Sequence, residues 1–429
     1  MVCDHSGHTE VPFQGASGYV RMSVAESPIT GSSDSAQLRA GPSMSQMIVG
    51  ALVGLTVGTI LTFGLAARTG STSTLVHFAP PFTDAASVPD SIRVLPETRG
   101  YDGQFYFRLA ESPLSTAQQA AGVQFDHPAL RTTRIGYPML TAALSLTPVS
   151  TVNAMLLVNA IAYGAIGVAG TSIAAFAGRR PQLGLALLFV PAFVYGTTMS
   201  VTDTVAGAFV LTGLSLCLRT AYVPAAVAFG AAALTRETAL LIPVVILAGL
   251  IYRRIRDRSS PEDSQLAVVG LLPIVCFVAW QSVVVALWGE VGPLSSSGKN
   301  LTIPFLGPIV TDNYLDPVTT EQWMNILVPG AMISIIAMTV VAFLRREVEG
   351  FNTNFVIGFG VATIIALSVG PALLETYRSS VRGMGDAALL ATVAVLFGTG
   401  TWSRLTLLSV VVVGGGLMMW ELRIAPDLS

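Results

Sequence analysis

Residues 47–67 have the sequence MIVGALVGLTVGTILTFGLAA, an uncharged apolar run that decides the class of this protein. At 1.5 Å per helical residue, about twenty residues cross the roughly 30 Å of a bilayer's hydrocarbon core. Similar runs recur from here to the end of the chain. The 429 residues are 52% hydrophobic and only 11% charged, and the mean hydropathy is +0.66. These values predict an all-α, polytopic membrane protein.

The charged residues limit the choice of partners. The net charge of -2 argues against nucleic acid as a partner, while the apolar runs imply a lipid bilayer. Only Lys299 among the 23 basic residues is lysine, so the other cations are guanidinium groups, which suit phosphate binding. The sequence has no P-loop and no metal-ligand spacing of His or Cys, so an ATP-driven pump and a zinc or haem site are not expected.

The arginine-rich segments predict the topology. Arg179-Arg180, the run at 253–258 and Arg345-Arg346 follow apolar runs and mark the cytoplasmic side. Residues 1–45, rich in Ser and Gly, are expected to form a disordered cytoplasmic tail before a transmembrane domain at 46–425. About eleven helices are then predicted, at 47–67, 152–178, 182–200, 205–218, 221–235, 238–252, 266–288, 326–344, 353–373, 384–401 and 405–421.

Residues 138–149 present a choice, because the uncharged stretch 138–178 could hold two helices. Two crossings would put Arg179-Arg180 outside, against the charge rule. We therefore expect 138–149 to dip into the outer leaflet and return. Two extracytoplasmic loops result, a large one at 68–137 and a second at 289–325.

The first loop contains an unusual aromatic segment, GYDGQFYFR at 100–108. A carboxylate such as Asp102 can take a proton from a hydroxyl during group transfer, although Asp-Gly also forms ordinary turns. Rings in such a segment can shape a substrate pocket or anchor an interfacial helix. The neighbouring candidates for substrate binding are Tyr101, Gln104, Phe105, Tyr106 and Arg108.

Other polar residues fall on the same predicted side of the membrane. Arg131 and Arg134 share a helix face before Tyr137, where they could clamp a phosphate or snorkel to the interface. Ionisable residues at membrane depth cost about 2.5–3.5 kcal/mol each, so they tend to be paired or functional. The remaining candidates for substrate binding are Asp203, Arg236, Glu237, Tyr377, Arg378 and Arg382, with a helix cap, a structural ion pair and rim charges as the alternatives.

Three motifs in order resemble those of bacterial GT-C type membrane glycosyltransferases. They are YDGQFY at 101–106, RTTRIGYP at 131–138 and LTRET at 234–238. The chain is similar to mannosyltransferases that use dolichyl- or polyprenyl-phosphate mannose, including protein and GPI mannosyltransferases. The resemblance implies that Asp102 is the catalytic base and that the donor is a polyprenyl-phosphate sugar. Unlike the protein mannosyltransferases, the chain has Gly103 rather than a second acid, so a divalent metal is neither indicated nor excluded.

The resulting expectation is an inverting glycosyltransferase at the outer face of a bacterial cytoplasmic membrane, acting on a cell-envelope acceptor. Arg131, Arg134 and Arg236 would bind the leaving phosphate, and Glu237 would orient Arg236. The alternative is a transporter or flippase of a lipid-linked or anionic substrate, with the arginines along its path. A transporter predicts polar groups on both sides of the membrane midplane, whereas the predicted topology gathers them on one side.

Overall fold

The structure, a computed structural model, describes residues 41–96, 98, 100–256, 260–295, 320–348, 353–368 and 376–424. The chain divides into two compact units, Met1–Leu38 and Arg39–Ser429, and only the second contains described residues. The tail predicted at 1–45 therefore lies outside the described residues, apart from 41–45. Within that short piece, the Ser43 hydroxyl caps the first helix.

Helices dominate the described part of the chain, and seven of its helical segments are long and apolar enough to cross a membrane. The protein is therefore an all-α multi-pass membrane protein, as predicted. The seven segments are α1 (Met44–Thr59) continued by η3 (Ile60–Gly64) and α2 (Leu65–Thr69), α6 (Thr151–Phe176), η6 (Glu237–Leu240) with α10 (Leu241–Ile255), α11 (Asp263–Trp288), α13 (Thr320–Leu344), α16 (Tyr377–Leu396) and α17 (Thr401–Ile424).

Further apolar segments are bent or short. The helix predicted at 182–200 is broken into η5 (Pro181–Phe189) and α7 (Pro191–Thr198), which meet at 53°, because Pro191 lacks an N–H and disfavours a helical residue before it. Helices α8 (Asp203–Leu218), α9 (Tyr222–Thr235) and α14 (Thr353–Leu367) are also apolar. The count of eleven crossings stays a prediction.

Two of these short helices, α8 and α9, have charged residues at ends that lie among the other helices. With 16 and 14 residues, α8 and α9 are only about 24 and 21 Å long, less than the hydrocarbon core. The N-terminal turn of α8 carries Asp203, and the C-terminal end of α9 is followed by Arg236 and Glu237. Helix α16 begins at Tyr377 rather than near 384, so Arg382 lies on the helix instead of before it.

Close helix packing holds the beginning of the chain. Gly50, Gly54 and Gly58 are the buried residues of α1, and they face the backbone of α6. A Cβ atom on Gly50 would stand 2.6 Å from the carbonyl oxygen of Gly167. Small residues at this spacing let two backbones approach closely in a membrane.

The first loop has its own ordered structure. It contains η4 (Thr72–Val76), α3 (Gly103–Glu111), a hairpin of β1 (Gln119–Ala120) and β2 (Val123–Gln124), and α4 (Pro128–Thr133). Helix α5 (Gly136–Ser145) follows, and whether it re-enters the membrane stays a prediction. Of the predicted loop 289–325, residues 296–319 lie outside the described residues, and η7 (Gly292–Leu294) packs near α4.

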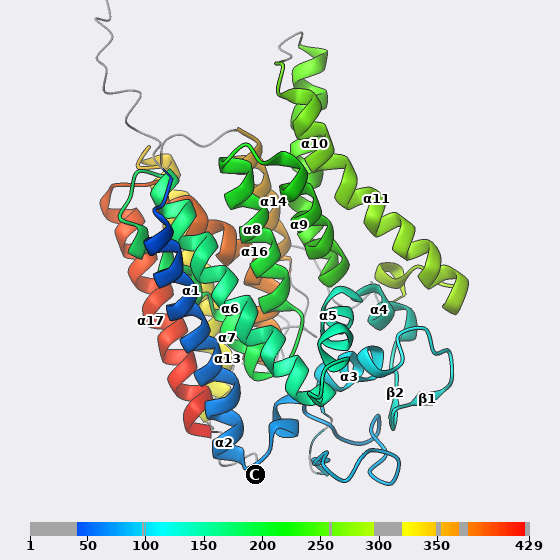
Figure 1. Cartoon of the computed structure of the whole chain (residues 1–429). Helices are drawn as coiled ribbons and strands as arrows, with labels where there is room; N and C mark the ends of the chain where they lie inside the picture. The colour runs from blue at the N-terminus through cyan, green and yellow to red at the C-terminus, as the bar shows by residue number, and fades with distance from the viewer. Residues whose placement is uncertain are drawn as a thin grey trace, which may run out of the picture. The chain divides into compact units, whose positions relative to one another are not determined.

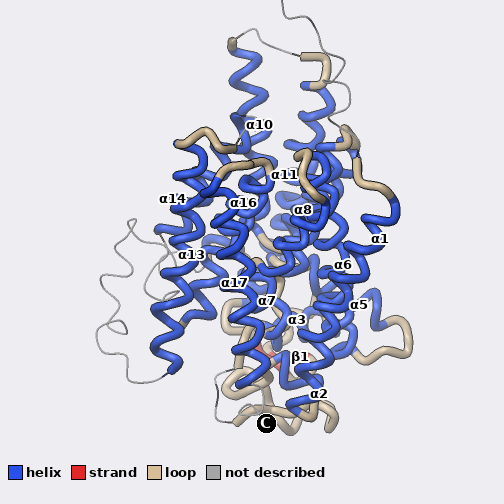
Figure 2. Tube along the Cα trace, turned by 90° about the vertical axis from the view of Figure 1, so that its left-hand side faces the viewer, coloured by secondary structure: helices blue, strands red, loops and turns tan. Residues whose placement is uncertain are grey.

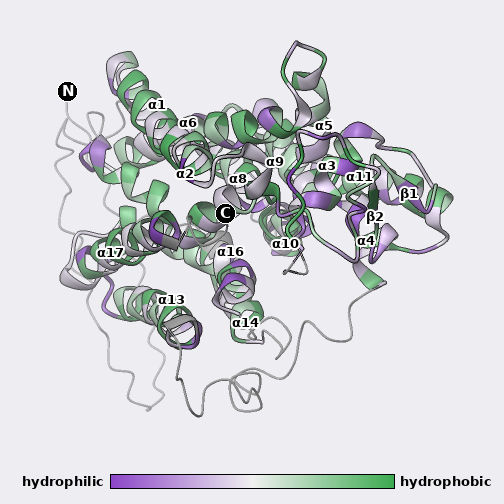
Figure 3. Cartoon of the chain, turned by 90° about the horizontal axis from the view of Figure 1, so that it is seen from below, coloured by the Kyte–Doolittle hydropathy of each residue, from purple (hydrophilic) through white to green (hydrophobic). Residues whose placement is uncertain are grey.

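The arrangement of the helices separates two ends of this unit. The N-terminal ends of α1 and α17 and the C-terminal end of α10 lie at one end, whereas α3, α4 and the hairpin lie at the other (Figure 1). The tube view shows the same separation, with α2 and β1 opposite the end of α10 (Figure 2). Hydrophilic residues gather around α3, α4 and the hairpin, while α1 and α6 are largely hydrophobic (Figure 3).

Candidate functional site

Asp102 lies at the start of α3, where the chain is tightly confined. A Cβ atom on Gly103 would stand 2.7 Å from the carbonyl oxygen of Val76 and 2.9 Å from that of Met199. Gly100 has a φ of 67°, a conformation that glycine adopts without strain. The glycines therefore let this segment fit between the η4 turn and the turn after α7, and the fit fixes where Asp102 points.

The Asp102 carboxylate is held between two guanidinium groups. Its Oδ1 lies 2.7 Å from Nη1 of Arg131, and its Oδ2 lies 2.6 Å from Nη1 of Arg382. Burial alone would raise the pKa of Asp102, but the two arginines hold that pKa below its usual range. In this state the carboxylate is a counter-ion of two arginines and a weak proton acceptor.

The ion pairs continue on both sides of Asp102. Arg131 also donates two hydrogen bonds to Asp126, at 2.8 and 2.6 Å. Nε of Arg382 donates to Asp203 at 3.0 Å, and Arg236 forms an ion pair with the other oxygen of Asp203. Arg236 further donates to the main-chain oxygen of Arg382 at 2.7 Å. A continuous network thus joins α4, α3, α16, α8 and the segment between α9 and α10.

Arg134 forms the other strong pair of the site. It donates to both carboxylate oxygens of Glu237, at 2.9 and 2.6 Å, and lies 3.4 Å from the hydroxyl of Tyr106. The expectation that Glu237 orients Arg236 is therefore wrong, because the ion-pair partner of Glu237 is Arg134 and that of Arg236 is Asp203.

All these side chains are largely buried, with between 2% and 21% of their surface exposed. Truncating one partner of such a pair strands a buried charge and typically costs about 3–5 kcal/mol. The network and the separate pair of Arg134 and Glu237 together match four cations to four acids. These are Arg131, Arg134, Arg236 and Arg382 with Asp102, Asp126, Asp203 and Glu237.

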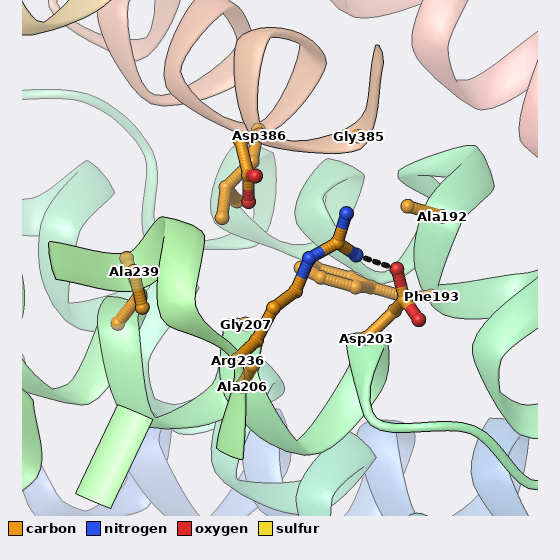
Figure 4. Close-up of a pocket in the computed structure, with 11 residues that line it drawn as sticks. Ala192, Phe193, Asp203, Ala206, Gly207, Arg236, Ala239, Gly385 and Asp386 are labelled. Atoms are coloured by element: carbon orange, nitrogen blue, oxygen red, sulfur yellow. Dashed lines mark ion pairs between the residues drawn. The ribbon is translucent and has the colours of Figure 1, made fainter. Parts of the chain in front are cut away.

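Two hollows adjoin the network. Arg236 and Asp203 line a small pocket together with Phe193 of α7 and Asp386 of α16 (Figure 4). A cavity of about 220 Å³ lies between η6, α10, α14 and α16, and both Glu237 and Asp386 line it. The pocket beside Arg236 holds only about 10 Å³, whereas the larger cavity is lined by the acids Glu237 and Asp386 and by no arginine.

Three of the sequence-predicted binding residues are used within the protein. Gln104 is fully buried, and its side-chain oxygen accepts hydrogen bonds from Thr83 and the N–H of Ala79. Arg108 donates to main-chain oxygens of Gln118, Val123 and Ala117 around the hairpin.

Tyr137 is likewise fully buried, and its hydroxyl donates to the carbonyl oxygen of Met155. The cause is common to Gln104, Arg108 and Tyr137. Their side chains are buried, so most of their polar atoms bond to neighbouring loops and helices, although Nε2 of Gln104 and Nε of Arg108 make no hydrogen bond among the described residues.

The aromatic residues surround the charges. The guanidinium carbon of Arg131 lies 4.5 Å from the centre of the Phe105 ring, and that of Arg382 lies 5.7 Å from the centre of the Tyr101 ring. Such cation–π contacts add to the ion pairs. Tyr101, Phe105 and Tyr106 therefore help to position the arginine side chains.

Tyr377 and Arg378 belong to a neighbouring group. The Tyr377 hydroxyl donates to Glu421 of α17 at 2.8 Å, and Nε of Arg378 lies 3.1 Å from that hydroxyl. Arg378 stands one turn before Arg382 on α16, but its own ion pair is with Glu421 at 3.9 Å. The structure thus unites most of the predicted site residues and pairs Arg378 elsewhere.

Three acids at or beside the site, Asp126, Asp386 and Glu421, were not among the residues predicted from the sequence. An Asp in an apolar helix, as Asp386 is, was a usable signal because such a residue is costly in a membrane. Within the described residues, no group of three or more His, Cys, Asp or Glu side chains is placed to hold a metal ion. No model of a known protein family and no curated protein sequence matches the chain.

Proposed function

We propose that the protein is a membrane glycosyltransferase that moves a sugar from a polyprenyl-phosphate donor to an acceptor hydroxyl. The observation that supports this most is Asp102 held between Arg131 and Arg382. Guanidinium groups bind carboxylate and phosphate oxygens with the same geometry, so a phosphate can compete with Asp102 for them.

The proposed reaction begins with that competition. When the donor phosphate takes over Arg131 and Arg382, it removes the charges that keep the pKa of Asp102 low. Asp102 then accepts the proton of the acceptor hydroxyl. The acceptor oxygen bonds to the anomeric carbon, and the carbon–oxygen bond to the phosphate breaks with its electron pair leaving on the phosphate. The configuration at the anomeric carbon inverts.

The other arginines support the leaving group in this proposal. Arg134 and Arg236 lie beside the pair of Arg131 and Arg382. Their positive charges complement the negative charge of the donor phosphate. Prearranged cations at the position where negative charge develops are an effective means of lowering a barrier. Their acid partners, Glu237 and Asp203, keep them aligned before the donor arrives.

The proposed site faces the extracytoplasmic side of a bacterial cytoplasmic membrane. The arginine-rich ends of the helices mark the cytoplasmic side by the charge rule, and α3 and α4 lie at the opposite end (Figure 1). Lipid-linked donors reach that face, and a cell-envelope hydroxyl is available there as acceptor.

One observation favours a second candidate, a transporter or flippase of a lipid-linked or anionic substrate. The bend of 53° between η5 and α7 and the helix ends at Asp203 and Arg236 resemble the broken helices that form transport sites. The paired charges would then open and close a path rather than support a reaction.

Transfer and transport are separated by reconstitution in liposomes. Membranes with the purified protein receive radiolabelled polyprenyl-phosphate mannose, glucose or arabinose, and the label is followed into a new glycoside or across the bilayer. We expect a new glycoside with the native chain and none with Asp102→Asn. The proposal is abandoned if Asp102→Asn retains transfer, or if the label crosses unchanged.

A further inference from the structure

Asp386 is an acid beside the network whose charge acts on Arg236 without a direct ion pair. It lies on α16, a 20-residue helix apolar enough to span a membrane. An acid at such a position costs about 2.5–3.5 kcal/mol on membrane insertion, so acids within membrane helices are usually paired or functional. No hydrogen bond or ion pair within 4 Å joins its carboxylate to another residue in the described part of the chain. Asp102, Asp126, Asp203 and Glu237, in contrast, are each paired with arginine.

The carboxylate of Asp386 stands between two hollows. On one side it lines the small pocket with Arg236 and Asp203 (Figure 4). On the other side it lines the cavity of about 220 Å³ together with Glu237 and Thr238. This cavity is smaller than the roughly 300–1,000 Å³ of common small-molecule sites, so it suits one compact ring.

The cavity offers hydrogen-bond groups without a partner. The Thr238 hydroxyl is buried and makes no hydrogen bond among the described residues. Asp386 supplies two acceptor oxygens, and Glu237 adds negative charge at the same wall. Two carboxylates repel a phosphate but accept hydrogen bonds from hydroxyl groups. Leu241, Val244 and Ile365 provide apolar surface for the carbon-bound hydrogens of a ring.

We propose that Asp386 binds hydroxyl groups of the donor's sugar ring in this cavity, next to the arginines that take its phosphate. The inference rests on the proposed function, since it assigns the ring of a polyprenyl-phosphate sugar. It adds a specificity-determining residue that acts on the sugar alone. The ring lies against Asp386 and Thr238, and the phosphate lies against Arg236 and its neighbours.

The test compares two lipids that differ only in the sugar. Binding of a short-chain polyprenyl phosphate and of its mannose and glucose derivatives is measured by calorimetry on the full chain in nanodiscs. We expect Asp386→Ala to weaken binding of the glycosylated lipids about ten-fold or more and to leave the sugar-free lipid unchanged, because hydrogen bonds to a charged group are strong. Asp386→Asn retains one acceptor oxygen and shows a smaller loss.

Controls keep the result specific. Asp90 is an exposed acid outside the network, and Asp90→Ala is expected to bind every lipid as the native chain does. Melting temperatures identify variants that fail to fold. If Asp386→Ala fails to fold, Asp386→Asn takes its place in the binding measurements. The inference is overturned if Asp386→Ala, or Asp386→Asn in its place, weakens the binding of all lipids equally or of none. It is also overturned if the native chain binds glycosylated and sugar-free lipid with the same affinity.

A failure of the proposed function gives a different pattern. If the native chain binds glycosylated lipid through Asp386 but transfers no label, the sugar site stands and the glycosyltransferase proposal falls. If transfer occurs and Asp386→Ala shows no sugar-dependent loss of affinity, the proposed function stands and this inference falls.

Discussion

Asp102 and Arg382 are 280 positions apart in the chain, and their side chains meet at 2.6 Å. One comes from the first loop after α2, and the other from α16 near the end of the chain. The pair therefore closes the helix assembly at the level of α3 and sets the position of the loop against α16. Any ligand that separates the two residues also loosens this closure.

The coupling between these residues can be measured by a double-mutant cycle. Asp102→Asn and Arg382→Gln each remove one partner from a buried network in which Asp203 and Arg131 still pair the remaining charges. Each is therefore expected to lower the free energy of unfolding by less than the roughly 3–5 kcal/mol of an isolated buried pair. The double variant is expected to lose less than the sum, with a coupling of about 0.5–3 kcal/mol. Unfolding in detergent measures all four proteins.

The more exposed pair of Arg253 and Asp263 is the control for this cycle. Its atoms lie 2.9 Å apart, but 32% of the Arg253 side chain is exposed. Its coupling is expected to be under about 1 kcal/mol. Strictly additive effects at Asp102 and Arg382 would contradict the close pairing.

Arg108 is expected to act on stability and not on donor binding. Arg108→Lys replaces a planar fork that serves three main-chain oxygens by a single ammonium group. Each lost hydrogen bond to a charged group is worth about 1.5–3 kcal/mol, so the melting temperature falls. The KM for the donor in the folded fraction stays unchanged.

Arg134→Lys is the contrasting variant, since Arg134 borders the proposed phosphate site. It is expected to raise the KM for the donor as well as lower stability. If Arg108→Lys raised the KM as much, Arg108 would have to reach the donor directly.

Gly103 controls the position of Asp102 through space that only glycine leaves open. In Gly103→Ala the new methyl group meets main-chain oxygens of Val76 and Met199, which have little room to move. Overpacking of this kind costs about 1–3 kcal/mol and shifts α3, so transfer is expected to fall together with stability.

Gly330 provides the matched control because a Cβ atom there meets nothing within 4 Å. Gly330→Ala lies inside α13 and is expected to leave stability unchanged or to raise it by up to about 1 kcal/mol. Equal losses in both variants, measured by melting temperature, would exclude the steric explanation at Gly103.

His77 is expected to make stability depend on pH. Burial, with a smaller contribution from Arg378, lowers the pKa of His77 to about 3. Below about pH 6.5, His77 binds a proton in the unfolded chain but stays neutral in the folded chain. The free energy of unfolding should therefore decrease as the pH falls from about 6.5 toward 3, by at most about 1.4 kcal/mol per pH unit.

His77→Asn should flatten this decrease. Asparagine tolerates the φ of 56° at this position, so the backbone keeps its conformation. His127→Asn, at an exposed position, serves as the control and should leave the slope as it is. The same slope in His77→Asn as in the native chain would show that other groups cause it.

Much of the fold follows from the sequence because long apolar runs have few alternatives. The run at 47–67 became α1 with its continuation, and the run at 266–288 became α11. The break at Pro191 was less accessible, because proline also occurs in continuous membrane helices. The beginning of α16 was misplaced because Arg378 and Arg382 lower its apolar character, although they are satisfied by acids from α17, α3 and α8.

The candidate site was predicted in its members but not in its pairings. Asp102, Arg131 and Arg382 are conspicuous charges in an apolar chain, which is why the sequence revealed them. That Glu237 meets Arg134 depends on where the residue that ends α4 comes to lie against the start of η6, over a separation of 103 positions. No local pattern carries that information, and the same holds for the inward orientation of Gln104 and Arg108.

The contact between α1 and α6 has a consequence for how this protein can vary. A Cβ atom on Gly54 would meet only main-chain atoms of α6, and one on Gly50 would meet the main chain of α6 as well as the Thr171 hydroxyl, so no substitution on α6 alone can make room for a side chain. On the opposite face of α1, Ile48 and Leu52 are more than half exposed and need only be apolar. Saturation mutagenesis of α1 should therefore recover functional variants with many apolar substitutions at Ile48 and Leu52 and with glycine alone at Gly50 and Gly54.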